Sequence, residues 1–205
     1  MKKLLFKHNA ILLGLLCVFL ITACGCTKTT EEERWNPALP PITQTGANTF
    51  GCKINGEIMI PRDSRVYSLG GIPTGVTYSV LRKPQNTANF DFIEARDRYT
   101  SRGGVVFKLP NIETLGVGEY LVKNIVGGFA STYPNIIYMQ ADYKYDLYGS
   151  IEGTGKITII RYDNEVISGT FYCKLKGYNN PNDIIEITEG RFDFNKKTIN
   201  TTTFR

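Results

Sequence analysis

From residue 49 onward, the pattern of hydrophobic and polar positions is that of short β-strands. Runs of β-branched and aromatic residues recur, separated by Gly, Asn, Asp and Pro, which favour turns. No stretch longer than one helical turn has an apolar repeat of about 3.6 residues. The pattern therefore predicts about nine or ten strands with no helices between them.

The clearest local signal is a hairpin at the start of this region. The runs 50–54 and 57–60 flank Asn55-Gly56, and these two residues suit the positive φ angles of a type I′ turn. Further strands are predicted at 75–82, 90–95, 104–109, 119–125, 136–143, 155–162, 166–176 and 184–194. Strands without intervening helices form an all-β domain, and we predict an antiparallel β-sandwich, with a closed β-barrel as the alternative.

The N-terminus has the pattern of a secretory signal. Three lysines precede an uncharged apolar run from residue 10 to 21. This run is about 12 residues long, too short for a bilayer span of about 20. It ends in Ile21-Thr22-Ala23-Cys24, which resembles the lipobox of bacterial lipoproteins. The resemblance implies cleavage before Cys24, attachment of diacylglycerol to its sulfur, and acylation of the new N-terminus with a fatty acid such as palmitate.

These patterns divide the chain into three parts. Residues 1–23 are the predicted lipoprotein signal peptide, 24–48 the lipidated N-terminus with a flexible, disordered tether, and 49–205 the β-domain. The tether is rich in Thr, Glu and Pro, and it contains Cys26 and Trp35, whose roles stay open. Acyl chains on Cys24 would hold the protein on a membrane, since each buried methylene contributes about 0.8 kcal/mol.

The predicted location is the outer membrane. Gly25 follows the lipidated cysteine, and it is not the aspartate that retains many lipoproteins at an inner membrane. The cluster Glu31-Glu32-Glu33 is loosely similar to the acidic export signal of Bacteroidota surface lipoproteins, although it starts later. The cell surface and the periplasmic face therefore both stay open.

Composition excludes several kinds of chemistry for the mature chain. The only histidine, His8, lies in the signal peptide, so Ser-His-Asp and Cys-His mechanisms and histidine metal sites are excluded. Loss of three signal-peptide lysines reduces the 24 basic residues to 21 against 19 acidic ones, a net charge of about +2. Without a basic stripe, a nucleic-acid partner is not expected. We predict no catalytic residue, no cofactor and no metal site.

Two cysteines of the β-domain are candidates for a disulfide. Cys52 and Cys173 each follow a phenylalanine by two positions in an alternating run, so both should point inward. In an oxidising envelope, a bridge would close a loop of about 120 residues and stabilise the domain by about 3–5 kcal/mol. The alternative is two separate, buried, reduced thiols.

Three further segments carry strand-and-turn patterns: Asn48–Gly56, Ile167–Phe171 and Ile187–Asp193. Their order and spacing resemble a family of small Bacteroidota lipoproteins catalogued as a domain of unknown function. That resemblance implies an envelope β-domain and carries over no functional residue. Within these segments, Gly169 and Gly190 predict bulges or close backbone approach, and Phe171 and Phe192 predict core anchors. Arg191 beside Asp193 predicts a surface or edge pair.

The strongest candidate for ligand binding is a tyrosine-rich segment. Exposed aromatic faces flanked by carboxylates suit sugars, and Asp142 and Asp146 lie among the tyrosines. The alternative is a strand whose tyrosines line a half-buried face. The candidate binding residues are Tyr138, Tyr143, Tyr145 and Tyr148.

We therefore predict a non-enzymatic binding or structural role at the membrane, with a glycan or an envelope protein as candidate partner. One alternative is a glycan-processing hydrolase, which needs two facing carboxylates about 5–10 Å apart. The other is an accessory subunit of an envelope complex. The scattered carboxylates available to a hydrolase are Asp91, Glu94, Asp97, Glu186, Glu189 and Asp193.

Overall fold

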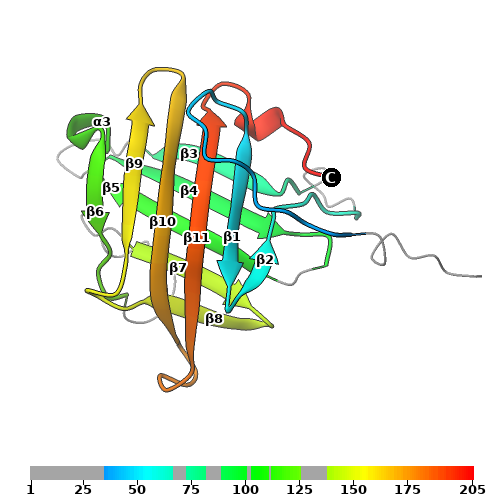
Figure 1. The fold of residues 1–205 in the computed structure, drawn as a ribbon, viewed down its shortest axis with the longest axis vertical. Helices are drawn as coiled ribbons and strands as arrows, with labels where there is room; N and C mark the ends of the chain where they lie inside the picture. The colour runs from blue at the N-terminus through cyan, green and yellow to red at the C-terminus, as the bar shows by residue number, and fades with distance from the viewer. Residues whose placement is uncertain (1–34, 67–72, 82–88, 101–102, 111, 126–137) are drawn as a thin grey trace, which may run out of the picture. The chain divides into compact units, whose positions relative to one another are not determined.

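The computed structural model describes residues 35–66, 73–81, 89–100, 103–110, 112–125 and 138–205. Residues 37–205 form one compact unit, and this unit is all-β, as the sequence predicts (Figure 1). The ends of two predicted strands, at Arg82 and at 136–137, lie outside the described residues. Within the described ranges, no helix has the length and apolar character needed to cross a membrane.

Most predicted strands are present. The predicted hairpin is β1–β2, with Asn55 and Gly56 both at positive φ as its turn requires. Two short helical segments, which the apolar pattern does not indicate, are also present. The elements of the described residues are β1 (Thr49–Ile54), β2 (Glu57–Met59), β3 (Val76–Leu81), β4 (Phe90–Asp97), β5 (Gly103–Pro110), α3 (Ile112–Leu115), β6 (Gly118–Leu121), β7 (Tyr138–Tyr143), β8 (Asp146–Ser150), β9 (Lys156–Tyr162), β10 (Val166–Gly177), β11 (Ile184–Asn195) and η2 (Ile199–Thr201).

The strands form one antiparallel sheet that folds over itself. Its order is β2-β1-β11-β10-β8-β7-β5-β4-β3, and β9 with β6 extends from β10. Strand β10 pairs with β9 over 167–172 and with β8 over 175–177, so the sheet turns from one layer into the other along this strand. In Figure 1, β9, β10, β11 and β1 cross in front of β3, β4, β5, β7 and β8. The fold is a sandwich of two layers joined by a continuous hydrogen-bonded ladder, similar to a barrel left partly open.

Aromatic side chains fill the space between the layers. Phe107 of one layer meets Phe171 of the other edge-on, with 4.5 Å between ring centroids. Phe171 and Phe192 are buried core anchors, as predicted. The predicted close approach at Gly190 is also confirmed, because a Cβ there would lie 2.4 Å from the Phe171 ring. Gly169 is equally restricted, by the Phe192 ring and by a backbone oxygen at 2.4 Å.

The predicted disulfide is wrong. Cys52 and Cys173 both point into the core, as the alternation indicates, but both are free thiols. Cys52 lies on β1 and Cys173 on β10, and β11 runs between these strands. Two strand spacings are about 9–10 Å, whereas a disulfide requires Cα atoms less than about 7 Å apart. The alternative, two separate buried thiols, is what the structure contains.

The folded unit begins earlier than the predicted boundary at residue 49. The chain packs against the domain from Pro37 onward, and residues 39–47, which we name the strap, lie on the outer face of β1 and β11 (Figure 1). The strap is held by hydrogen bonds to a buried carboxylate, that of Asp193. This long-range partner is why a Thr- and Pro-rich segment without an apolar pattern is ordered.

Candidate functional site

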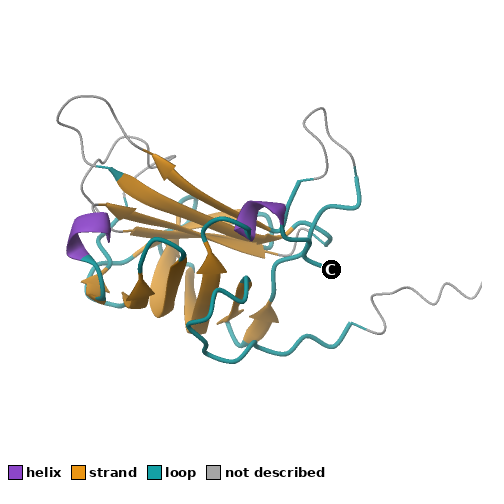
Figure 2. Ribbon diagram, turned by 90° about the horizontal axis from the view of Figure 1, so that it is seen from above, coloured by secondary structure: helices purple, strands orange, loops and turns teal. Residues whose placement is uncertain are grey.

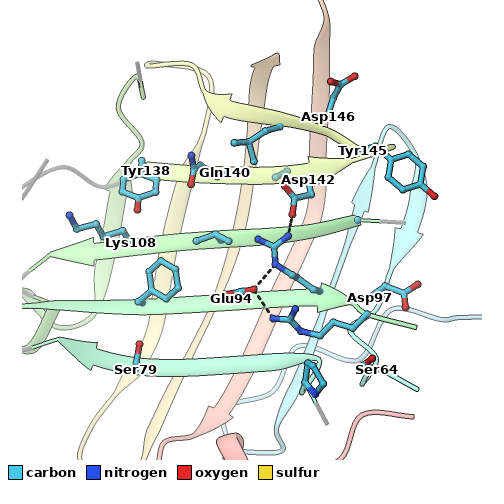
Figure 3. Close-up of a pocket in the computed structure, with 18 of the residues that line it drawn as sticks. Ser64, Ser79, Glu94, Asp97, Lys108, Tyr138, Gln140, Asp142, Tyr145 and Asp146 are labelled. Carbon is cyan, nitrogen blue, oxygen red and sulfur yellow. Dashed lines mark hydrogen bonds and ion pairs between the residues drawn. The ribbon is translucent and has the colours of Figure 1, made fainter. Parts of the chain in front are cut away.

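The outer face of the layer β3-β4-β5-β7-β8 is hollowed into a groove of about 910 Å³ (Figure 3). Because side chains alternate between the two faces of a strand, every second side chain of these strands lines the groove. On β4, for example, Ile93 and Ala95 point into the core, whereas Glu94 and Arg96 line the groove. Figure 2 shows the two layers from above. The groove lies on the side of this layer that faces away from the other one, because its lining residues alternate with core residues.

One end of the groove is aromatic and holds a buried cation. The ammonium of Lys108 on β5 lies 4.3 Å from the ring centroid of Phe90 and 5.9 Å from that of Tyr138. Lys108 is only 1 % exposed, so these cation–π contacts act in a largely desolvated environment. Phe92 and Val106 extend the apolar floor towards the centre of the groove.

The other end carries a ladder of ion pairs across the strands. The Glu94 carboxylate binds Arg98 Nη2 at 2.8 Å and Arg96 Nε at 2.5 Å. The Arg96 guanidinium continues across β5 to the Asp142 carboxylate on β7 (Figure 3). Each of these four side chains is between one fifth and about one third exposed, so solvent can reach the ladder.

A glycine makes room for this ladder. Arg96, Gly104 and Asp142 are consecutive partners across β4, β5 and β7. A Cβ at Gly104 would lie 2.5 Å from Cγ of Arg96. Because position 104 has no side chain, Arg96 can lie flat across β5 and reach Asp142.

The structure divides the four candidate tyrosines between two faces. Tyr138 and Tyr145 line the groove, and Tyr145 is 92 % exposed at its rim. Tyr143 and Tyr148 instead point into the core, where the Tyr148 hydroxyl donates to Asp183 at 2.7 Å. For those two tyrosines, the alternative prediction holds, because their rings are packed in the domain and do not face a ligand.

The reason for this division is a tight hairpin that the sequence analysis does not predict. Lys144 and Tyr145 both adopt positive φ and connect β7 to β8. Neither is Gly, Asn or Asp, the residues that usually mark such a turn, so the run 138–148 shows no break. Strand β8 is therefore absent from the predicted strands. The turn places Tyr145 at the end of the groove, whose lining also includes Asp142 and Asp146.

The six candidate carboxylates do not converge. Glu94 and Asp97 line the groove, and Asp97 is held by Arg62 at 2.7 Å. Asp193 lies under the strap, and Glu186 and Glu189 are on β11 in the other layer. Across the described ranges, no group of three His, Cys, Asp or Glu side chains could hold a metal ion.

Asp91 belongs to a separate, buried cluster. It accepts a hydrogen bond from the Tyr78 hydroxyl at 2.7 Å and is 2 % exposed. Burial raises the pKa of the Asp91 carboxyl above its ordinary value, although the hydrogen bond from Tyr78 opposes this. Burial also raises the pKa values of Tyr78 and Tyr162. This cluster points away from the groove, since Asp91 alternates with the groove residues Phe90 and Phe92.

The charges of the groove favour a neutral, polar ligand. Two arginines face the carboxylates of Glu94, Asp142 and Asp146, while Asp97 is neutralised by Arg62 from outside the lining. An anionic ligand at this end would meet an excess of negative charge, whereas hydroxyl groups can both donate to carboxylates and accept from guanidinium groups.

Several groove residues were not predicted from the sequence, among them Arg96, Arg98, Lys108 and Gln140. The one local signal is that β4 carries apolar residues on both faces: Phe90 and Phe92 on the groove face, and Ile93 and Ala95 on the core face. Comparison with models of protein families, with curated proteins and with solved structures finds no match. Function is therefore inferred from the residues of this chain alone.

Proposed function

We propose that the mature chain is a lipid-anchored cell-envelope protein that binds a neutral glycan in the groove and leaves it chemically unchanged. The observation that carries this proposal is a groove whose lining combines the exposed ring of Tyr145 at one end with the donors and acceptors of Arg96, Asp142 and Asp146. The apolar face of a sugar ring packs on an aromatic side chain, and its hydroxyls pair with planar polar groups at the edge.

The contacts of Arg96 support binding over hydrolysis. A glycosidase keeps space for its substrate between two carboxylic groups. In the groove, the guanidinium of Arg96 occupies the space between Glu94 and Asp142 and binds both. The mature chain would also contain no histidine to act as a general acid or base.

Binding can be tested with a panel of neutral, soluble oligosaccharides: α- and β-glucans, mannans, xylans and chitin oligomers. We expect at least one to bind by calorimetry, with an affinity that falls about tenfold in Tyr145→Ala, which corresponds to about 1.4 kcal/mol. The matched control is Tyr172→Ala, because Tyr172 is an exposed tyrosine in the other layer. Absence of binding across the panel would contradict the proposal. Release of shorter sugars would favour the hydrolase instead.

Lipidation at Cys24 is the second part of the proposal, and the lipobox Ile21–Cys24 supports it. We propose the outer membrane as the location, on either its surface or its periplasmic face. Cells fed an alkyne analogue of palmitate should label the wild-type protein in the membrane fraction, and Cys24→Ala should be unlabelled and unprocessed or soluble. Normal labelling and retention of Cys24→Ala would contradict lipidation at this residue.

A role as an accessory subunit of an envelope complex is the second candidate. The observation that favours it is the group of apolar side chains on and around α3 and β6 that are each more than half exposed: Leu115, Val117 and Leu121. Apolar side chains gathered on a surface commonly mark a protein contact. Co-purification of one fixed partner from detergent extracts, lost in Leu121→Glu, would support this role, and repeated isolation of a lone monomer would count against it.

A further inference from the structure

The strap is bound through a carboxylate that it covers. Asp193 points outward from β11, yet it is only 1 % exposed. Its Oδ1 accepts a hydrogen bond from the backbone N–H of Gly46 at 2.8 Å, and its Oδ2 accepts from the N–H of Thr45 at 2.9 Å and of Ala47 at 3.2 Å. The hydroxyl of Thr43 adds a further bond to Oδ2 at 2.7 Å.

Residues of two of the three motif segments make up the rest of the docking surface. A Cβ at Gly51 would lie 2.7 Å from Cδ of Pro40, so the strap is seated directly on the bare backbone of β1. Arg191 donates to the carbonyl of Pro40 at 3.3 Å. The expected surface pair of Arg191 with Asp193 is therefore not formed, because each side chain binds the strap instead. These motifs hold the N-terminal segment of their own chain.

The strap and the groove lie on opposite outer faces of the sandwich. The strap crosses the outer face of the layer that contains β1 and β11 (Figure 1). The groove lies on the outer face of the layer β3-β4-β5-β7-β8 (Figure 3). The strap therefore begins on the face of the sandwich opposite to the groove.

The length of chain before the strap limits how freely the domain can turn. Between Cys24 and Pro37 there are 12 residues, which span at most about 40 Å and on average about 20 Å. A unit of this size has a radius of gyration of about 15 Å. To turn the groove towards the bilayer, the linker would have to pass around the edge of the sandwich, a path comparable with its average reach.

We propose that docking of the strap holds the strap face of the sandwich towards the lipid bilayer and presents the groove away from it, to ligands on the aqueous side. The lipid surface is thus the partner of the strap face. This inference rests on the lipid anchor at Cys24 in the proposed function. If the strap were undocked, the flexible linker would run from Cys24 to Asn48 and contain about twice as many residues. The preferred orientation of the domain would then be lost.

The test is energy transfer from the lipidated protein to fluorescent headgroups in phosphatidylcholine vesicles. Single labels are placed at Tyr172→Cys on the strap face and at Ser79→Cys in the groove, each with Cys26→Ser. The native Cys52 and Cys173 are buried and escape labelling. We expect the label at position 172 to transfer at least twice as efficiently as the label at 79. Equal transfer from both positions, or stronger transfer from 79, would overturn the proposal.

Two variants then test the strap itself. Asp193→Asn should weaken docking and bring the two transfer efficiencies together. Because this variant could also unfold, a second one inserts 20 Gly and Ser residues after Asn36, which leaves every strap contact intact. This insertion should abolish the difference between the labels, and an unchanged difference would contradict the role of the linker. Failure of the protein to float with the vesicles would instead show that the lipid anchor is wrong.

Discussion

Oδ1 of Asp193 lies 2.8 Å from the backbone nitrogen of Gly46, although the two residues are 147 positions apart. Burial by itself raises the pKa of this carboxyl, but the bonds from Thr43, Thr45, Gly46 and Ala47 together hold the pKa of Asp193 below its ordinary value. The ionised carboxylate is thus the form that the strap binds, and its bonds join the N-terminal segment to the last long strand.

Replacing Asp193 should therefore destabilise the fold. Asn has one acceptor oxygen, and it turns an NH₂ group towards backbone N–H groups, which leaves buried donors unpaired. We expect Asp193→Asn to lower the free energy of unfolding by about 2–4 kcal/mol in denaturant titrations. The matched control is Glu186→Gln, an exposed carboxylate on the same strand, which should change it by less than about 0.5 kcal/mol.

Asp193 should also affect the acid limb of the stability curve. Because its folded pKa is lowered, its contribution is complete above the unfolded value of about 3.9 and is lost as the pH falls through the folded pKa. As the pH falls below 4, the free energy of unfolding should decrease less in Asp193→Asn than in the wild type. Parallel acid limbs for the two proteins would show that Asp193 is not the group responsible.

Asp91 should have the opposite effect on pH dependence. Its folded pKa is raised, chiefly by burial, so the stability it contributes is complete below the unfolded value of about 3.9 and is lost as the pH rises through the folded pKa. Asp91→Asn keeps an oxygen that can accept from Tyr78 and carries no charge. Relative to the wild type, this variant should gain stability from pH 4 towards pH 8, measured by thermal unfolding. A constant difference across that range would show that the folded pKa of Asp91 is not raised.

Gly104 should be coupled to Arg96. A methyl group at position 104 would meet Cγ of Arg96 at 2.5 Å, so Gly104→Ala should displace this side chain and cost about 1–3 kcal/mol. The cost should shrink when Arg96→Ala removes the clash, which a double-mutant cycle measures as a coupling energy. Additive effects would mean that the arginine does not lie across β5. The same displacement should weaken glycan binding.

The cysteines offer a direct check of the strand order. With β11 between them, Cys52 and Cys173 should both remain thiols, and burial raises the pKa of each. Both should resist alkylation in the native protein under oxidising conditions and react within minutes in denaturant. Peptide mapping that recovers a Cys52–Cys173 bridge would contradict the order β1-β11-β10.

Local patterns in the sequence predict the strands well and the site poorly. The Asn55-Gly56 hairpin, the inward phenylalanines and the crowded glycines could be predicted, because each depends on neighbours a few residues away or on simple alternation. Strand β8 could not, because its turn uses Lys144 and Tyr145 in a conformation that their side chains do not favour. The same turn places Tyr145 in the groove lining and Tyr148 in the core, the reverse of what an unbroken strand would do.

The sequence by itself determined an all-β domain, its inward-facing residues and the absence of histidine chemistry after the predicted signal peptide. These follow from periodicity and composition, which are properties of the chain alone. Only the tertiary structure decided that the two cysteines lie apart, that Arg96 joins Glu94 to Asp142, and that Asp193 binds the strap. Those results depend on which strands are neighbours, and strand order arises from contacts between distant residues that no local pattern specifies.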